Sequence, residues 1–199
     1  MNQELRDTVA NVMHSGHFPL ILGGDHSIAI GSLAGVGRHV KRVGVIWFDA
    51  HGDVNTPDTS PSGNIHGMPL AAALGYGHPA LTSIAGASSA VQPEHTVLIG
   101  TRSLDDGEKS VFLKHVGITV FTMHELDRLG MSRVMEMAID IASNDTDGVH
   151  LSLDLDGLDL ITRRELGHRF REESPSARAT LRWSCFRLQV VSSVPNSLK

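Results

Sequence analysis

The chain has 199 residues, 41% of them hydrophobic, and is long enough to bury the core of one ordinary domain. Its formal net charge of -5 argues against a nucleic-acid-binding protein, because phosphate recognition requires a basic surface. With no apolar run of about 18 residues and a single cysteine, Cys185, the sequence predicts a cytoplasmic protein without a membrane span or an internal disulfide.

Short apolar runs alternate with helical patterns along residues 1–159. The apolar runs predict buried strands at Phe18–Leu22, Val43–Phe48, Thr96–Ile99, Ile118–Phe121 and Val149–Leu153. The helical patterns predict helices at residues 1–16, Ser27–Lys41, His66–Leu74, Gly107–His115, His124–Leu129 and Ser132–Ala142. This alternation indicates an α/β fold of three layers, in which helices cover both faces of a mainly parallel sheet.

Three of the predicted strands end in acidic motifs. The motifs are GGDHS at residues 23–27, DAHGDVN at residues 49–55 and SLDLDGLD at residues 152–159. In an extended chain, D-x-H-x-D and D-x-D place their polar side chains on one side, and parallel strands bring their carboxyl ends to one edge of the sheet. We therefore expect a convergent cluster of His26, Asp49, His51, Asp53, Asp154 and Asp156.

Four carboxylates and two imidazoles are costly to bury together unless cations accompany them. A pair of divalent metals removes this cost, and a ligand set without thiolate suits Mn, Fe, Co or Zn. Two ions roughly 3.5–4 Å apart can hold a water that becomes a hydroxide nucleophile near neutral pH. Each motif alone also suits an ordinary loop or a capped turn, but the three together favour a metal centre.

The motifs resemble those of the ureohydrolase family, the arginases and agmatinases, and are most similar to those of bacterial arginases. A fourth motif, SGNIHGMP at residues 62–69, completes the family's order over residues 1–159. The resemblance implies an arginase/deacetylase-like α/β/α fold. It also implies hydrolysis of L-arginine to L-ornithine and urea by a hydroxide that bridges two Mn ions, in a homo-oligomer.

The resemblance assigns roles to individual residues. One Mn ion would be held by His26, Asp49, Asp53 and Asp154, and the other by Asp49, His51, Asp154 and Asp156. Asp53 would also stabilise the tetrahedral intermediate, and His66 resembles the residue that shuttles protons in the family. The substrate-binding residues implied in the same way are His51, Asn55, Ser62, Asn64 and Asp105.

The loop at residues 55–64 bears on the choice of substrate. Asn55, Ser62 and Asn64 match the arginase loop that holds the α-carboxylate of the substrate, and Asp105 matches the acid near its α-amino group. Agmatine lacks that carboxylate, so L-arginine is the expected substrate and an agmatinase is the alternative. The same residue types also suit a plain loop, and the acids at residues 105–108 also suit a helix start.

The chain changes character after Asp159. Residues 160–199 contain eight of the seventeen Lys and Arg residues and three acids, and they show no sustained helix or strand period. We therefore divide the chain into a partial arginase-like domain, residues 1–159, and a disordered or poorly packed tail, residues 160–199. A basic nucleic-acid-binding arm is the less favoured alternative.

A shifted reading frame would account for this tail. Read one base out of frame, residues 162–170 permit A-P-G-V-G-T-P-V, which resembles the family's continuation. We interpret the tail as the product of one lost nucleotide just after the Asp159 codon. The fold would then be incomplete at both ends and would lack the family's guanidinium-binding glutamate, so a non-catalytic, metal-binding chain is the alternative to an active enzyme.

Overall fold

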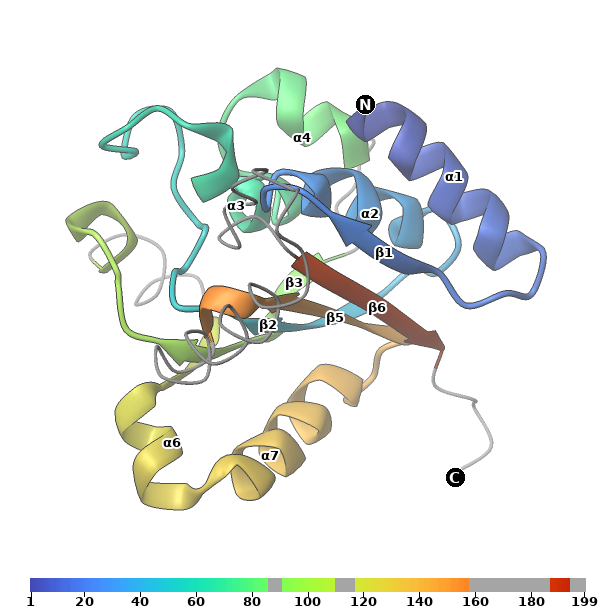
Figure 1. The fold of residues 1–199 in the computed structure, drawn as a ribbon. Coiled ribbons are helices and arrows are strands. Elements are labelled where there is room, and N and C mark those ends of the chain that lie inside the picture. The colour runs from blue at the N-terminus through green and yellow to red at the C-terminus, as the bar shows by residue number, and fades with distance from the viewer. Residues whose placement is uncertain (86–90, 110–116, 158–186, 194–199) are drawn as a thin grey trace, which may run out of the picture.

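A computed structural model of the chain describes residues 1–85, 91–109, 117–157 and 187–193, which form one six-stranded sheet between two groups of helices (Figure 1). The strand order is β1–β6–β5–β2–β3–β4. The strands are β1 Leu20–Gly23, β2 Val43–Phe48, β3 Val91–Thr101, β4 Thr119–Thr122, β5 Gly148–Asp154 and β6 Arg187–Ser193. The strands β5, β2, β3 and β4 pair in parallel, which confirms the predicted α/β class with a mainly parallel sheet.

Helices cover both faces of this sheet (Figure 1). On one face lie α1 Asn2–His14, α2 Ile28–Gly37, α3 Pro69–Ala73 and α4 Pro79–Ala85, and on the other lie α6 Met123–Leu129 and α7 Met131–Ser143. Two single turns of 3-10 helix, η1 Ile65–Gly67 and η3 Leu155–Gly157, precede α3 and follow β5. In the part of the chain that the structure describes, none of these helices has the length and apolar character needed to cross a membrane.

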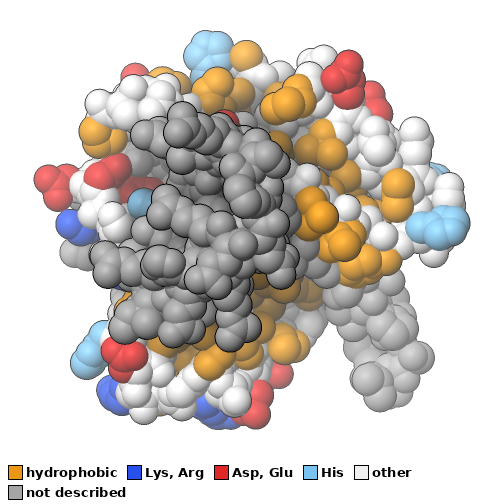
Figure 2. All heavy atoms as spheres, viewed as in Figure 1, with side chains coloured by type: hydrophobic (Ala, Val, Ile, Leu, Met, Phe, Trp, Pro, Cys, Tyr) orange, Lys and Arg blue, Asp and Glu red, His pale blue; other side chains and the backbone are white. Residues whose placement is uncertain are grey.

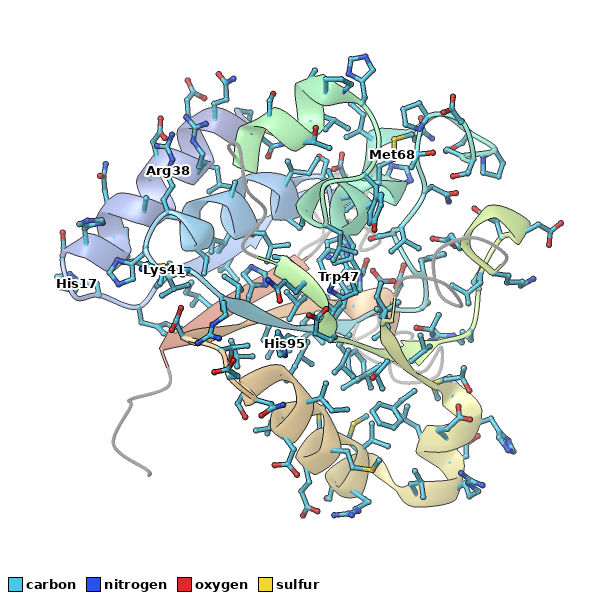
Figure 3. All side chains as sticks on the ribbon, turned by 180° about the vertical axis from the view of Figure 1, so that it is seen from behind. His17, Arg38, Lys41, Trp47, Met68 and His95 are labelled. Atoms are coloured by element: carbon cyan, nitrogen blue, oxygen red, sulfur yellow. The ribbon has the colours of Figure 1, made fainter. Side chains whose placement is uncertain are left out.

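The central strand β2 is buried along its whole length, as its apolar sequence predicts. Val45 and Trp47 belong to the core on the α1 and α2 side of the sheet, whereas Ile46 and Phe48 belong to the core on the α7 side. Trp47 is fully buried and lies near the middle of the molecule (Figure 3). Burying each of these large side chains contributes about 1.5–3 kcal/mol, so β2 anchors both layers.

The alternation along β5 decides which of its side chains reach the acidic cluster. His150, Ser152 and Asp154 are buried, and they alternate with apolar residues that pack on the α7 side. The His150 ring lies 3.1 Å from the hydroxyl of Ser32 in α2, which fixes the direction of the buried set. Asp154 therefore projects toward the α2 side at the carboxyl end of β5.

Several predicted elements differ in extent from the observed ones. The helix predicted at His66–Leu74 is broken at Met68 into η1 and α3, because Pro69 starts a new helix at its first turn. The short helix α4 was not predicted. The helix predicted at Gly107–His115 falls largely on residues 110–116, which lie outside the described residues.

Seven residues of the segment 160–199, in which the sequence shows no sustained helix or strand period, form a strand. Strand β6 lies between β1 and β5 and runs antiparallel to both, with Val190 opposite Leu151 on one side and Leu20 on the other. Its hydrogen-bonding partners are remote in sequence, and local periodicity does not report such pairing. The rest of this tail, residues 158–186 and 194–199, lies outside the described residues.

The sheet leaves apolar side chains exposed at β1. Leu20 and Leu22 are each 58% exposed and Phe18 is 52% exposed, whereas Ile21 packs against the core beneath α1 and α2. Figure 2 shows hydrophobic side chains at the surface over the region where Figure 1 places β1. The predicted burial of the strand at Phe18–Leu22 is therefore found only on the α1 and α2 side of β1.

Candidate metal centre and substrate pocket

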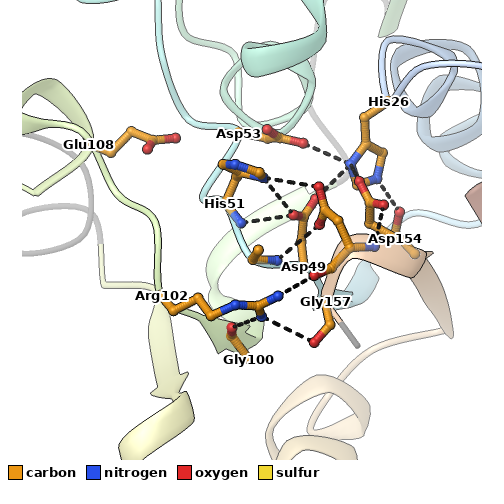
Figure 4. A network of polar contacts seen from close by, with 12 residues as sticks. His26, Asp49, His51, Asp53, Gly100, Arg102, Glu108, Asp154 and Gly157 are labelled. Carbon is orange, nitrogen blue, oxygen red and sulfur yellow. Dashed lines mark hydrogen bonds and ion pairs between the residues drawn. The ribbon is translucent and has the colours of Figure 1, made fainter. Parts of the chain in front are cut away.

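The cluster forms where parallel strands β2 and β5 end side by side. Phe48 pairs with Leu153, so Asp49 and Asp154 leave the sheet as neighbours. His26, which lies between β1 and α2, points its Nδ1 atom at them, 2.8 Å from Asp49 Oδ2 and 3.7 Å from Asp154 Oδ2 (Figure 4). All three side chains are 1% exposed. The predicted meeting of the three acidic motifs at one edge of the sheet is therefore observed.

The spacing within the motifs works through turns rather than through extended chain. Asp49 Oδ1 accepts a hydrogen bond from the backbone N–H of His51 at 2.8 Å. Asp154 Oδ1 accepts the equivalent bond from Asp156 at 3.0 Å. These are Asx-type turns, in which a carboxylate fixes the backbone two residues later. The side chains share one side as predicted, but the alternation of an extended strand is not the reason.

Asp53 approaches the cluster from an unusual backbone conformation. Its φ is 54°, in the left-handed region that non-glycine residues rarely occupy. Its Oδ2 lies 2.8 Å from Nδ1 of His26, and the residue is 6% exposed. Strain of this kind persists where the surrounding structure holds it, often at functional sites.

The ligand atoms fall into two groups that share one carboxylate. His26, Asp49 and Asp154 form the first group, and Asp49, His51 and Asp156 form the second. Within each group the candidate ligand atoms all lie within 4.8 Å of one another. Sharing of Asp49 is the arrangement expected of a bridging ligand between two ions.

The electrostatics of the cluster are dominated by its negative charge. Burial alone would lower the pKa of His26, but the carboxylates of Asp49 and Asp53 outweigh it and raise that pKa to about 9. Asp156 and Asp49 raise the pKa of His51 to about 11. Burial raises the pKa of Asp53, whereas the pKa of Asp49 is lowered because its two histidine partners outweigh the effect of burial. Without another cation, the imidazoles supply the positive charge that the cluster needs.

The residues present fit a divalent metal pair. The buried atoms His26 Nδ1, Asp49 Oδ2 and Asp53 Oδ2 meet one another without a well-aligned hydrogen bond among the described residues. One ring N–H cannot serve two carboxylates at 2.8 Å, whereas a cation can bind all three groups at once. Oxygen and imidazole donors are the ligands of Mn, Fe, Co or Zn.

A pocket of about 470 Å³ opens above the cluster. It is lined by His26, His51, Asp53, Asn55, Ser60, Pro61, Ser62, His66, Gly67, Ser103, Leu104, Asp105, Glu108, Asp154 and Asp156. Nine of the eleven predicted site residues are thus in its wall. Asp49 is among the metal-ligand groups, and Asn64 is exposed at the start of η1 without lining the pocket.

A hydrogen-bonded network connects the predicted substrate residues. Asn55 Nδ2 donates to Asp105 Oδ2 at 2.6 Å, and the hydroxyl of Thr59 donates to Asn55 Oδ1 at 2.9 Å. The same hydroxyl accepts the backbone N–H of Thr56 at 2.9 Å. Thr59 therefore fixes which end of the Asn55 amide faces Asp105.

Glu108 lines the pocket but was expected only as part of a helix start. It forms a reciprocal cap with Asp105, each carboxylate accepting the backbone N–H of the other residue. Its Oε1 also accepts a 3.4 Å bond from the backbone N–H of Val54, beside Asp53. Burial raises the pKa of Glu108 to about 7. The D-x-x-E spacing was visible in the sequence, but it indicated a cap and not a pocket wall.

His26 is held from outside the cluster by two residues that the sequence analysis did not select. Its Nε2 lies 2.7 Å from the hydroxyl of Ser152, and its ring stacks on Trp47 at a centroid distance of 4.1 Å. Ser152 precedes Asp154 by two positions on β5, so it faces the same side. An oxygen at Nε2 directs the proton to that nitrogen and leaves Nδ1 free for a metal.

The fold and the cluster define an α/β protein with a candidate two-metal centre at the strand ends. The chain belongs to the arginase family, whose family model matches residues 1–162. It is 67% identical over 158 residues to an arginase of Bacillus caldovelox and 62% identical over 158 residues to one of Brevibacillus brevis. These matches cover 79% of this chain and 52% and 53% of those proteins, so the chain spans about half the length of the curated relatives it matches.

Solved structures give the same result. The native Bacillus caldovelox arginase superposes with a TM-score of 0.77 at 67% identity, over 79% of this chain and 52% of that one. An Entamoeba histolytica arginase in complex with L-ornithine superposes with a TM-score of 0.68 at 45% identity, over 79% of this chain and 54% of that one. The predicted resemblance to arginases is thereby confirmed.

Proposed function

We propose that this chain carries the binuclear manganese centre of an arginase and hydrolyses L-arginine to L-ornithine and urea. The observation that carries the proposal is Asp49, a buried carboxylate common to two ligand groups whose other members, His26, His51, Asp154 and Asp156, line a pocket. Membership of the arginase family supports the reaction class. The neighbour solved with L-ornithine supports the substrate class.

We assign the ligands to the two Mn ions as the resemblance to the family implies. One set is His26, Asp49, Asp53 and Asp154, and the other is Asp49, His51, Asp154 and Asp156. When bound, the metal pair supplies a water that is acidic enough to act as hydroxide near neutral pH. Buried, fixed carboxylates hold such a centre without reorganisation during the reaction.

The pocket offers complementary charges to the two ends of L-arginine. The acidic floor suits the guanidinium, so that Asp53, at the floor, would stabilise positive charge at the nitrogen atoms as the planar group becomes tetrahedral. At the other end, the Asp105 carboxylate suits the α-ammonium group. The amide of Asn55 and the hydroxyl of Ser62 suit the α-carboxylate, and we place Asn64 with them although it is outside the pocket wall.

His66 is the residue that we assign to proton transfer. It lies in η1, lines the pocket and is exposed to solvent. An imidazole in this position can exchange a proton with water at one nitrogen and pass it to the leaving amine of ornithine. His51, half exposed at the pocket wall, would contact the substrate as well as a metal.

Urea release from L-arginine by the purified chain with added Mn(II) tests the proposal. The Asp154→Ala variant, checked by circular dichroism for retention of fold, is the control, because it removes a proposed bridging carboxylate. We expect urea above this control, and less from agmatine, which lacks the α-carboxylate. Urea at the level of the control would favour the non-catalytic alternative, and a preference for agmatine would contradict the choice of substrate.

The setting and the domain boundary are part of the same proposal. We propose a cytoplasmic protein from a homo-oligomeric family that lacks much of the family's subunit interface, and light scattering of the purified chain would measure its oligomeric state. We also propose that the arginase-like domain ends at residue 159 and that a lost nucleotide produced the tail. Resequencing the coding DNA across codons 155–165 tests this, and an intact frame there would contradict it.

A further inference from the structure

Arg102 lies at the carboxyl ends of three strands, beside the proposed metal centre (Figure 4). Its Nη1 donates to the carbonyl oxygens of Gly100 and Gly157, each at 3.2 Å, and its Nη2 donates to the carbonyl of Asp156. Its backbone N–H donates to the carbonyl of Ala50 at 2.9 Å. One residue therefore connects the chain after β2, the end of β3 and the turn after β5.

The acceptors at Asp156 and Gly157 belong to η3, the single helical turn that follows β5. Carbonyl groups at the end of a helical turn have no partner within the turn, so an external donor stabilises their position. A guanidinium suits this task because its planar fork donates to several acceptors at once, and hydrogen bonds from a charged donor are roughly twice as strong as neutral ones.

The position of η3 sets the position of the Asp156 carboxylate. Asp156 Oδ2 lies 3.4 Å from Nδ1 of His51, and its Oδ1 accepts a 3.4 Å bond from the backbone N–H of Ala50. Both distances are long, so these contacts alone hold the carboxylate loosely. The carbonyl of the same residue is held by Arg102. The guanidinium thus fixes the backbone from which one member of the second ligand group projects.

Close packing makes this part of the turn sensitive to small displacements. A Cβ on Gly157 would lie 2.8 Å from the Phe48 ring and 3.2 Å from Cα of Asp49, so η3 lies directly against the chain that carries the shared ligand. A shift of η3 would therefore move Asp156 relative to Asp49. His26 and Asp53 come from other segments, whereas the carbonyl groups that bind the Arg102 guanidinium belong to Gly100, Asp156 and Gly157.

We propose that Arg102 is a positioning residue for the ion assigned to Asp49, His51, Asp154 and Asp156, and that it acts by fixing η3. The inference rests on the proposed two-metal centre. It predicts that loss of the guanidinium lowers the binding affinity of one ion and leaves that of the other almost unchanged. A general structural role would instead weaken both ions or the whole fold.

Titration of the metal-free full chain with Mn(II) tests the inference. The variants are Arg102→Met, which removes the fork, and Arg102→Lys, which keeps the charge. Arg133→Met is the matched control, since Arg133 is an exposed arginine of α7 that pairs with Glu136 at 3.0 Å. Calorimetry gives the number and affinity of bound ions, electron paramagnetic resonance separates coupled pairs from single ions, and thermal unfolding of the metal-free chains reports the fold.

We expect two ions in the unmodified chain and in Arg133→Met, with the spectrum of a coupled pair. In Arg102→Met, one ion should bind with an affinity within about twofold of the unmodified value, and the other at least tenfold more weakly, because an outer group that orients a ligand typically contributes 10–100-fold. The spectrum should then be that of a single ion, and Arg102→Lys should recover only part of the loss.

Two bound ions of unchanged affinity in Arg102→Met would overturn the inference and leave the proposed centre intact. Equal weakening of both ions would also overturn it. If the unmodified chain bound fewer than two ions, the two-metal proposal itself would be wrong, and the role of Arg102 would fall with it.

Discussion

Replacing Ser152 by alanine should weaken binding of the ion held by His26 as well as lower the stability of the fold. The Ser152 hydroxyl lies 2.7 Å from Nε2 of His26, and both residues are buried. Removing it leaves a buried N–H without its partner, which costs about 1–3 kcal/mol. Loss of an outer partner of a metal-binding histidine reduces affinity by about 10–100-fold, or about 1.4–2.8 kcal/mol, so the two estimates agree.

The chain provides a matched control in Ser32. Its hydroxyl is also fully buried and lies 3.1 Å from a histidine, but that histidine is His150, which belongs to neither metal-ligand group. Ser32→Ala should therefore lower the free energy of unfolding by a similar amount without changing Mn(II) affinity. Calorimetric titration and denaturant unfolding of both variants measure the two effects. Unchanged Mn(II) affinity in Ser152→Ala, or equal weakening in both, would refute the reasoning.

Three further predictions concern the pocket and its supports. Thr59→Val should weaken binding of L-ornithine by about 5–10-fold, because it removes a hydrogen bond that orients Asn55, whereas Thr59→Ser retains this hydrogen bond and should bind L-ornithine normally. Calorimetry measures both affinities. The affinity for putrescine, a diamine without an α-carboxylate, should be the same in the two variants. Gly157→Ala should lower stability by about 1–3 kcal/mol, because the new Cβ would overlap the ring of Phe48; thermal unfolding measures this, and an unchanged midpoint would contradict it. Burial raises the pKa of Glu108 from 4.5 to about 7, so the folded chain favours the protonated carboxyl group. The stability that this protonated group contributes is complete below pH 4.5 and is lost as the pH rises through about 7. The stability of Glu108→Gln relative to the unmodified chain should therefore rise by about 1–2 kcal/mol between pH 5 and pH 8 in metal-free unfolding, after allowance for water in the pocket, and a pH-independent difference would argue against it.

The parts of the fold predicted from the sequence are those whose pattern is local. The run VGVIWF has no charged residue, and such a run predicts a strand buried on both faces. The structure agrees, since all six residues of β2 are buried. Along β5, fully buried residues alternate with partly buried ones, because the two faces of the strand pack against different layers. By contrast, β6 depends on two strands that lie far away in sequence, and the short helix α4 carries too few residues for a helical period. Local patterns contain no information on such pairing.

The residues of the candidate site also fall into two groups, those that the local sequence indicates and those that only the fold brings together. Its carboxylates and imidazoles could be selected because acids rarely follow buried strands in such numbers without a partner. Ser152 could have been found from its position two residues before Asp154 on one face of β5. Arg102 could not, since its acceptors are carbonyl groups of Gly100, Asp156 and Gly157. Every residue has a carbonyl group, so only the arrangement in space makes these three a binding site for an arginine.

The turns at Asp49 and Asp154 show why aspartate suits these two positions. In each, Oδ1 accepts a backbone N–H two residues later, which places the next ligand of the motif, His51 or Asp156. The other oxygen, Oδ2, faces His26. One carboxylate thus both shapes the loop and supplies a ligand atom. Asparagine would keep the turn with a neutral side chain, whereas glutamate would keep the charge but place it one methylene farther from the backbone. The requirement for both functions at once explains why the motif contains aspartate at the exit of each strand.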